Sequence, residues 1–252
     1  MALALIRPQA RDLGGGFVVR RLLPAAARQA VGPFLFFDHF GPLALQPADN
    51  HDVRPHPHIG LATLTYLFDG AMQHRDSTGA VQRIEPGAVN WMTAGRGIVH
   101  SERTPADLRG RTHTRHGLQL WVALPAADEA IEPSFAHTSA AAIPELEVGG
   151  AVVRVLVGSA FDATSPVAVR SPTLAIDTAL AAEGPARVVL IGGDPLGRRL
   201  LWWNFVATRR EQLAEAAAAW AAGPGAAGDA AARFAQVPGE TEFIPAPPFP
   251  AA

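Results

Sequence analysis

The stretch Pro55-His-Pro-His-Ile-Gly-Leu-Ala-Thr-Leu-Thr-Tyr-Leu-Phe-Asp-Gly70 places two histidines directly before a long apolar run. Its two prolines favour an extended backbone and cannot donate ladder hydrogen bonds, so the histidines are expected at a sheet edge or a barrel rim. His56 and His58 then project from one face of the chain, roughly 6.5 Å apart. The run Leu61–Phe68 predicts a strand that begins just after them.

The stretch Trp91-Met-Thr-Ala-Gly-Arg-Gly-Ile-Val-His-Ser-Glu102 ends in a second pair of residues with metal-binding chemistry. His100 and Glu102 are again two residues apart, and the interval since His58 is long enough for about four short strands with their turns. Closing these strands into a small barrel would bring the two pairs face to face. Three imidazoles and one carboxylate suit Fe(II), Mn, Ni or Cu, and four ligands leave two octahedral positions open for substrate. Either pair alone is more often a surface or packing feature, but together they favour a metal site.

The composition removes several kinds of chemistry. The 252 residues include no Cys, and all 21 basic residues are Arg, so disulfides, thiolate metal sites and lysine Schiff bases are excluded. The 9 histidines all lie between His39 and His137. A His-based metal site is therefore expected in the first half of the chain and not in the second.

The sequence has the features of a cytoplasmic protein that binds neither nucleic acid nor a membrane. Its formal net charge is −2 and 48% of its residues are hydrophobic, which allows a sizeable core and provides no basic surface for nucleic acid or anionic lipid. The first residues lack the basic segment and long apolar run of a signal peptide. No stretch approaches the ~18 apolar residues of a membrane-spanning helix.

Short apolar runs between turn residues predict an all-β protein. In the first half they recur at roughly 8–12-residue spacing, which is typical of a sandwich or barrel. The strands predicted there are Phe17–Val19, Phe34–Phe37, Leu61–Phe68, Val81–Ile84, Val89–Met92 and Leu118–Leu124. Residues 125–144 are expected to form a connection. Four later runs then predict a second barrel, namely Ala151–Val157, Val167–Val169, Leu174–Ile176 and Arg187–Ile191.

The end of the chain predicts one helix and an extended tail. Thr208 and Glu211 fit a capping box, and apolar residues then recur at helical spacing up to Trp220. Residues 225–232 are small and are expected to form a mobile connection. The Pro-rich tail is expected to lie over a barrel surface and to bury three apolar side chains, Phe243, Ile244 and Phe249.

Together with two further segments, the two stretches quoted above resemble the pirin family of the cupin superfamily. The further segments are Val31-Gly-Pro-Phe-Leu-Phe-Phe-Asp-His-Phe-Gly-Pro42 and His74-Arg-Asp-Ser77. This resemblance covers roughly residues 15–125. Further along, Gly193-Asp-Pro-Leu-Gly197 is similar to an element of the pirin C-terminal domain, and Leu201-Trp-Trp-Asn-Phe-Val206 is similar to a bacterial subgroup.

The resemblance implies a bicupin, in which two antiparallel β-barrels of the jelly-roll type pack face to face and are followed by a C-terminal helix and an extended tail. It implies a metal-binding cupin domain at residues 1–135 and a second cupin domain, without a His-based metal site, at residues 145–252. The family's metal ligands fall on the quartet that the spacing argument gave, His56, His58, His100 and Glu102. The metal implied is Fe(II), with Mn, Ni, Cu, Co or Zn as alternatives.

The resemblance also implies an oxidoreductase, a dioxygenase that uses dioxygen to oxidise a small aromatic substrate, a flavonol such as quercetin. Glu102 would then be a metal ligand and also the base that accepts the proton of the substrate hydroxyl. The alternative is a regulatory protein, a transcription cofactor or enzyme modulator, in which the metal controls binding to a protein partner without turnover. A charged patch around Arg109–Arg115 would favour this alternative.

The sequence predicts the local environment at three other positions. Ala62 stands where many cupins have a Glu, so a more open or more apolar pocket is expected. His74 and Asp76 are expected in a solvated hairpin, because the residues after them favour a turn. The segment 109–116 is expected to be a solvated loop.

Two pairs of bulky neighbours are expected to alternate along strands. One of Trp91 and Met92 is expected to line the pocket while the other faces outward. Trp202 and Trp203 are expected on opposite faces of one strand, with one of them in the core.

Overall fold

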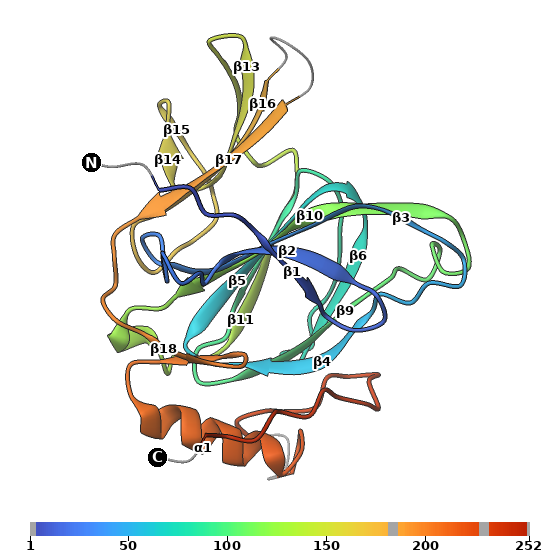
Figure 1. Ribbon diagram of the computed structural model, residues 1–252, viewed down its shortest axis with the longest axis vertical. Coiled ribbons are helices and arrows are strands. Elements are labelled where there is room, and N and C mark those ends of the chain that lie inside the picture. The colour runs from blue at the N-terminus through green and yellow to red at the C-terminus, as the bar shows by residue number, and fades with distance from the viewer. Residues whose placement is uncertain (1–3, 181–185, 227–231, 251–252) are drawn as a thin grey trace.

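Nearly all regular structure in the computed structural model is antiparallel β-sheet (Figure 1). The structure describes residues 4–180, 186–226 and 232–250. The largest sheet has seven strands, which follow one another across it in the order β1 (Gln9–Asp12), β2 (Val18–Leu23), β3 (Phe34–Leu45), β10 (His113–Ala123), β5 (Leu61–Gly70), β8 (Val89–Thr93) and β11 (Ser134–Thr138).

A four-stranded sheet faces it and completes the first domain. Its strands follow in the order β4 (Val53–His58), β9 (Ile98–Arg103), β6 (Met72–Asp76) and β7 (Val81–Ile84). β4 is an edge strand that pairs with β9. The two prolines of the His-x-His segment thus lie at a sheet edge, as their missing N–H groups predict.

Alternation along β5 separates the two faces of the seven-stranded sheet. Leu61 packs in one cluster with Ile98 of β9, inside the first domain. Its neighbour Ala62 belongs to a different cluster, which contains Leu156 and Ala175 of the second domain. Successive side chains of a strand point to opposite faces, so β5 helps to form both the interior of the first domain and the interface with the second.

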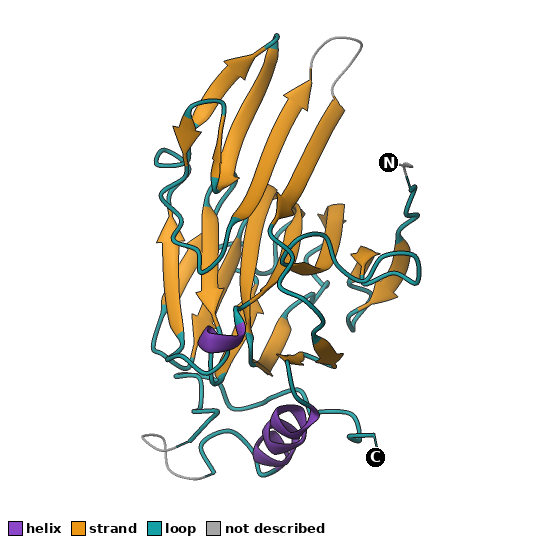
Figure 2. Ribbon diagram, turned by 90° about the vertical axis from the view of Figure 1, so that its left-hand side faces the viewer, coloured by secondary structure: helices purple, strands orange, loops and turns teal. Residues whose placement is uncertain are grey.

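The second domain contributes a four-stranded sheet to that interface. Its order is β12 (Glu145–Val148), β13 (Ala151–Val157), β16 (Thr173–Leu180) and β17 (Ala186–Gly193), and a short hairpin joins β14 (Ser159–Ala160) to β15 (Ala163–Thr164). Figure 2 shows this sheet at the end of the molecule opposite the helix. The predicted all-β architecture of two antiparallel domains is confirmed.

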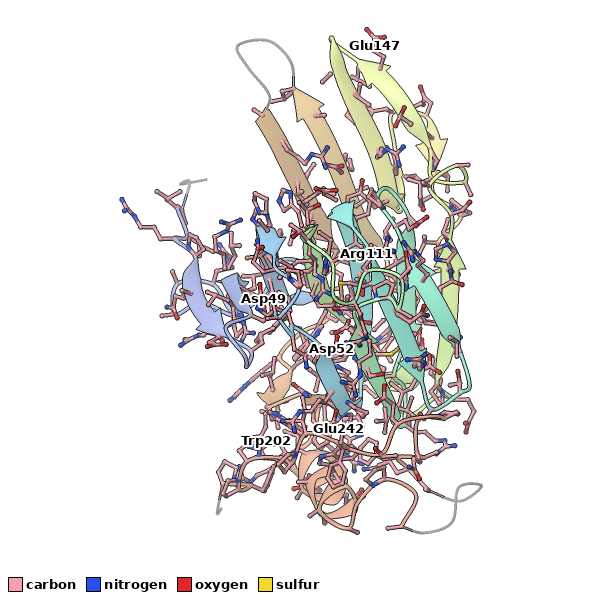
Figure 3. The ribbon with its side chains drawn as sticks, turned by 90° about the vertical axis from the view of Figure 1, so that its right-hand side faces the viewer. Asp49, Asp52, Arg111, Glu147, Trp202 and Glu242 are labelled. Atoms are coloured by element: carbon pink, nitrogen blue, oxygen red, sulfur yellow. The ribbon has the colours of Figure 1, made fainter. Side chains whose placement is uncertain are left out.

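After β17 the chain returns to the first domain through β18 (Leu200–Trp202), β19 (Phe205–Ala207) and helix α1 (Arg210–Ala221). Figure 3 shows Trp202 and Glu242 at this end and Glu147 at the opposite tip. Phe205 forms a β-bridge with Ile59, directly after β4. Gly60 permits this approach, because its φ is +67° and a Cβ there would lie 2.0 Å from the Val206 carbonyl oxygen. A segment from the second half thus lies against the histidine strand.

Helix α1 buries the predicted side chains, Leu213, Ala216, Ala217 and Trp220. Its predicted N-cap is wrong by one residue. The backbone N–H of Arg209 donates to Gln212 Oε1 over 3.1 Å, so the helix begins after Arg209. The Thr208 hydroxyl instead donates to buried Glu129 over 2.8 Å, a tertiary partner that the local sequence does not indicate.

Two further predictions about elements are wrong. Residues 167–169 form no strand, although Val167 is buried in the core between the domains. The expected connection over 125–144 contains β11, which pairs with β8 and so completes the seven-stranded sheet. Of the expected mobile connection over 225–232, residues 227–231 lie outside the described residues.

The C-terminal tail is bonded to the outer face of β9. Glu240 accepts a hydrogen bond from Ser101 Oγ over 2.7 Å and two from Arg103, of 3.1 and 2.5 Å. Ser101 and Arg103 alternate with His100 and Glu102 along β9 and therefore point away from them. The tail thus supports β9, the strand of His100 and Glu102, from behind.

Further along the tail, the Ile244 N–H donates to the Pro55 carbonyl over 2.8 Å. Ile244 and Phe249 are half-buried, but Phe243 is 38% exposed, contrary to its prediction. The Phe243 ring makes an edge-to-face contact with Trp220, and the rest of the ring is exposed to solvent. None of the described helical segments has the length and apolarity to cross a bilayer.

Candidate metal centre and cavity

Three histidines from two neighbouring strands converge inside the first domain. His56 and His100 are direct partners in the β4–β9 register. The ring centroids are 4.3 Å apart for this pair and 5.0 Å apart for His58 with either of the others. One ligand nitrogen from each ring lies within 4.8 Å of the others, and all three side chains are buried. The cluster can therefore hold a metal ion.

Backbone carbonyl groups orient two of these rings. The His56 Nδ1 donates to the carbonyl of Arg54 over 2.9 Å, and the His58 Nδ1 donates to that of Asn204 over 3.0 Å. Each bond assigns the ring proton to Nδ1 and leaves Nε2 free as a ligand. Asn204 lies in the turn between β18 and β19, so the second half of the chain orients a histidine of the first.

The third ring, His100, is 1% exposed, and neither of its nitrogens has a hydrogen-bond partner in the described part of the chain. Burial lowers the pKa of His56 to about 4 and holds the pKa values of His58 and His100 well below 6.5. Near pH 7 all three rings are therefore neutral, with lone pairs available. Buried nitrogen atoms without partners fit a bound metal ion.

Glu102 lies two residues beyond His100 and lines the same cavity as His56 and His58. Its Oε1 is buried, again without a partner among the described residues. Burial raises the pKa of the Glu102 carboxyl from 4.5 to about 7, although attraction to Arg115 opposes this. The group whose ligand atoms lie within 4.8 Å of one another contains the three histidines and not Glu102, so the role of Glu102 as a fourth ligand stays a prediction.

Arg115 corrects the expected solvated loop over 109–116. Its side chain is fully buried, and it donates to the His51 carbonyl over 3.0 Å and to Thr104 Oγ1 over 2.9 Å. It lies on β10, in the middle of the seven-stranded sheet, and the sheet's closure buries it. Arg109 is exposed but bonded to Asp52 over 2.6 Å. The two arginines therefore form no common surface patch.

His74 and Asp76 are also buried, so the expected solvated hairpin is wrong. The His74 Nε2 donates to Asp76 Oδ2 over 2.9 Å, and Asp76 also accepts from the Thr78 hydroxyl over 2.6 Å. The His74 ring stacks on Phe135 at 4.3 Å and lies 5.4 Å from His100. Phe135 belongs to β11, the strand that the sequence did not indicate, and it covers His74.

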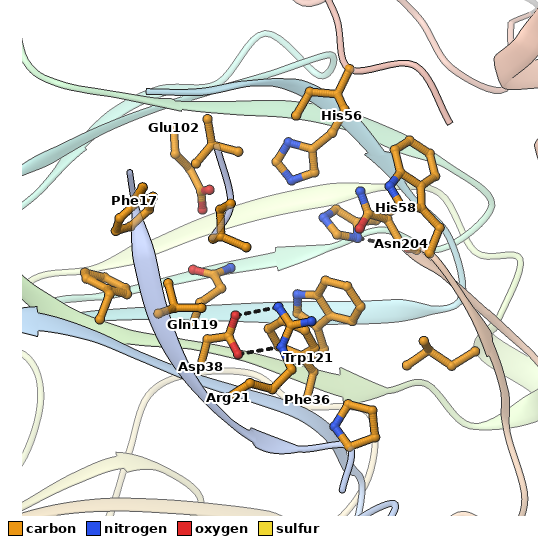
Figure 4. Close-up of a pocket in the computed structure, with 18 of the residues that line it drawn as sticks. Phe17, Arg21, Phe36, Asp38, His56, His58, Glu102, Gln119, Trp121 and Asn204 are labelled. Carbon is orange, nitrogen blue, oxygen red and sulfur yellow. Dashed lines mark hydrogen bonds and ion pairs between the residues drawn. The ribbon is translucent and has the colours of Figure 1, made fainter. Parts of the chain in front are cut away.

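A cavity of about 400 Å³ opens beside the histidines (Figure 4). Its polar wall residues are His56, His58, Glu102, Arg21, Asp38, Gln119 and Asn204. Its aromatic wall residues are Phe17, Phe36, Phe40, Trp121 and Trp203. A mainly apolar cavity with a few polar groups is the usual form of a small-molecule site.

Four aromatic and sulfur side chains differ from their expected positions. Trp91 and Met92 do alternate, but both are buried in separate core clusters and neither lines the cavity. β18 ends at Trp202, and Trp203 follows in a turn with a φ of +51°. Both tryptophans are half-buried, and Trp203 reaches the cavity.

Ala62 has no part in the cavity, contrary to the expectation that it shapes the pocket. It is fully buried between the two domains, on the face of β5 opposite to the histidine cluster. Arg21 and Gln119, by contrast, line the cavity but were not predicted from the sequence. Gln119 alternates with Leu118 and Leu120, which is a local signal of a two-faced strand, but Arg21 stands between Arg20 and Leu22 and carries no such signal.

Comparison with known proteins places the chain in a family. It matches the pirin family over residues 16–122 and the pirin C-terminal cupin domain over residues 136–225. It is 42% identical to a pirin-like protein of Caulobacter vibrioides, in an alignment that covers 84% of this chain and 91% of that protein.

Solved structures of similar proteins have the same fold as this chain. A crystal structure of quercetin 2,3-dioxygenase from Acinetobacter baumannii superposes with a TM-score of 0.87 at 32% identity and covers 98% of this chain and 95% of its own. A second structure with the same name and source has a TM-score of 0.77 at 24% identity, covers 85% and 94% respectively, and supports the fold. The matches over both domains show that this chain belongs to the pirin family.

Proposed function

We propose that this pirin is a metal-dependent dioxygenase that oxidises a flavonol such as quercetin with dioxygen. The observation that carries the proposal is the position of the histidine cluster, on the wall of a mainly apolar cavity of about 400 Å³. Such a cavity suits a flat aromatic molecule. The likeness to the Acinetobacter baumannii quercetin 2,3-dioxygenase supports this substrate class.

The metal in this proposal is one divalent ion, Fe(II), held by His56, His58, His100 and Glu102. Neutral imidazoles and one carboxylate suit Fe(II), and the same donors accept Mn, Ni, Cu, Co or Zn. When bound, the metal supplies the Lewis acidity and redox chemistry that a reaction with dioxygen needs. In this assignment the metal-binding domain is residues 1–135, and the domain at 145–252 holds no metal.

The chain's own residues would do three things. The histidines fix the position of the metal, because carbonyl bonds hold two of the rings. Glu102 accepts the proton of the substrate hydroxyl, because its carboxylate lies in the same cavity as His56 and His58. The aromatic wall residues exclude water and hold the substrate ring.

The test is metal analysis followed by aerobic incubation of the Fe(II) form with flavonols, scored by oxygen uptake. The loaded protein should consume oxygen with quercetin, and the metal-free protein should not. Glu102→Ala should lose both metal and uptake. If the fully metal-loaded protein takes up no oxygen with flavonols, the result would instead favour the regulatory alternative.

The regulatory alternative requires a patch near the cavity mouth that a protein partner could recognise. Its candidate in the sequence was the cluster Arg109–Arg115. Because Arg115 is buried and Arg109 is bonded to Asp52, that cluster offers no support, and the dioxygenase is the better supported proposal.

A further inference from the structure

A row of polar side chains crosses the inner face of the seven-stranded sheet. Arg21 on β2 is the cross-strand partner of Asp38 on β3, and Asp38 is the partner of Gln119 on β10. Opposed residues of antiparallel strands project from one face. All three line the cavity that holds the histidines, and Figure 4 shows Arg21 and Asp38 on the opposite side of it from His56.

The hydrogen bonds within this row leave donors free toward the cavity. Arg21 donates from Nε and Nη2 to the two oxygens of Asp38, over 2.8 and 2.7 Å. Both carboxylate oxygens are thereby used, while Nη1 bonds to no residue in the described ranges. The Gln119 Oε1 accepts from the Thr65 hydroxyl over 2.9 Å, which leaves its amide NH₂ free. The row of Arg21, Asp38 and Gln119 therefore presents N–H groups and suits a ligand with acceptor oxygens.

The surroundings hold these donors in place. The Arg21 guanidinium lies 4.2 Å above the ring of Phe36, and that ring stacks on Trp121 with centroids 4.0 Å apart and an interplanar angle of 11°. Asp38 is 2% exposed. A guanidinium held by a buried carboxylate and an aromatic face is preorganised, so a ligand that binds it loses little freedom in doing so.

We propose that Arg21 and Gln119 form a second anchoring point that selects an aromatic substrate with an oxygen acceptor, a phenolic or carboxylate oxygen, at the end remote from the metal. The inference rests on the proposed function, because it takes the histidine cluster to hold the other end of the substrate. The substrate class is thus an aromatic molecule with oxygens at both ends.

The experiment compares ligands that share one end and differ at the other. Quercetin and 3-hydroxyflavone carry the same hydroxyl–keto group, but 3-hydroxyflavone lacks the phenolic hydroxyls. A 3-hydroxyflavone with a carboxylate on its pendant ring separates the carboxylate from the phenol. Affinities are measured on the Zn(II)-loaded protein, which is redox-inert, by quenching of tryptophan fluorescence.

The variants are Gln119→Leu and the double change Arg21→Met with Asp38→Asn. The double change is needed because losing Arg21 alone would leave a buried carboxylate unpaired. The control is Arg20→Met, a neighbour on β2 whose exposed side chain bonds to His39 and the Gly41 carbonyl. Metal content and Tm confirm that each variant is folded.

Wild type and Arg20→Met should bind quercetin or the carboxylate analogue at least about tenfold more tightly than 3-hydroxyflavone, the effect of one charged hydrogen bond. In Gln119→Leu and in the Arg21→Met, Asp38→Asn double variant, the ratio of the dissociation constant for 3-hydroxyflavone to that for quercetin or the carboxylate analogue should fall close to one. An unchanged ratio in both would overturn the second anchoring point even if oxygen uptake with quercetin is observed.

A separate readout keeps the anchoring point testable if flavonols are not the substrate. 4-Hydroxybenzoate should raise the Tm of the metal-free wild type and of Arg20→Met, but not that of the Arg21 double variant. If 4-hydroxybenzoate gives these Tm shifts while no flavonol binds, the dioxygenase proposal fails and the anchoring point stands. If neither flavonols nor 4-hydroxybenzoate bind the wild type, the anchoring point is wrong.

Discussion

His56 and His100 lie directly opposite each other across the antiparallel strands β4 and β9, with their ring centroids 4.3 Å apart. Strand register sets this relationship, because a slip of one residue would turn His56 and His58 to the other face of the sheet. The candidate metal centre is therefore built on the hydrogen-bond ladder of two strands. Ligands on such rigid elements are held more precisely than ligands on loops.

Removing one ligand should weaken metal binding strongly and leave the fold intact. His56→Ala and Glu102→Ala should each lower metal affinity by more than the roughly 10–100-fold typical of losing an outer partner. Equilibrium dialysis followed by elemental analysis measures this. His113→Ala is the control, because its ring bonds to the Arg111 carbonyl away from the cavity. Full metal content in both ligand variants would disprove the quartet.

Metal affinity should rise with pH up to about 7 and then level off. In the metal-free protein, burial raises the pKa of Glu102 to about 7, so below that pH the metal must displace a proton from the carboxyl. Protonation of His56 does not compete with metal binding in this pH range, because burial lowers the pKa of His56 to about 4. Competition with a chelator between about pH 5.5 and about pH 8.5 measures the slope. The slope should vanish in Glu102→Gln, and its persistence there would exclude Glu102 as the titrating ligand.

The convergence of the three histidines could be predicted from the sequence because the rule behind it is local. Residues two apart on a strand share a face, so His56 with His58 and His100 with Glu102 each form a pair before any tertiary structure is known. The Asn204 carbonyl that orients His58 could not be found in this way. It comes from a turn far along the chain, and a backbone carbonyl leaves no trace in the residue type.

Burial of single charged groups was the part that could not be predicted. Arg115 and His74 stand among polar residues, and charged residues in such contexts are usually solvated. Their burial follows from the strands beside them, and for His74 from Phe135 on β11. Because β11 lies in a segment with the composition of a connection, the cover over His74 could not be inferred.

The tail should make the stability of the protein sensitive to acid through Glu240. Burial opposes ionisation of Glu240, but hydrogen bonds from Arg103 and Ser101 outweigh it and hold its pKa below 4.5. Its contribution is therefore complete above about pH 4.5 and is lost as pH falls through the lowered pKa. Glu240→Gln should reduce the free energy of unfolding at pH 7 by about 1–3 kcal/mol.

Urea unfolding of wild type and Glu240→Gln at a series of pH values tests this. The difference between the two proteins should shrink toward zero in acid. Comparing the pair cancels the destabilisation that both suffer when the low-pKa histidines are protonated. A difference that stays constant with pH would show that the tail does not depend on the charge of Glu240.

A buried hydrogen bond from the Tyr66 hydroxyl to Asp177 Oδ2, over 2.8 Å, should couple the two domains. Tyr66→Phe should lower the free energy of unfolding by about 1–3 kcal/mol, because Asp177 would remain buried with fewer partners. Adding Asp177→Leu should restore part of the loss, since no carboxylate is then buried without the tyrosine, and Arg187, which lies 3.5 Å from Asp177 Oδ2, is exposed enough to be solvated instead. Chemical denaturation measures the stability, and metal content should not change, because Tyr66 points away from the cavity. Equal loss in the single and double variants would contradict this account.

Ala62→Glu should destabilise the protein and should not add a metal ligand. Many cupins have a Glu at this position, but the Ala62 side chain is fully buried between the domains, on the face of β5 away from the cavity. A carboxylate there would be buried without a partner, at a cost of several kcal/mol. Unfolding by urea should show this cost, and Ala62→Ser, which introduces a smaller neutral group, should cost less. A soluble Ala62→Glu protein with wild-type stability and tighter metal binding would mean that β5 presents its opposite face to the metal, and that the β5 register with β8 and β10 is wrong.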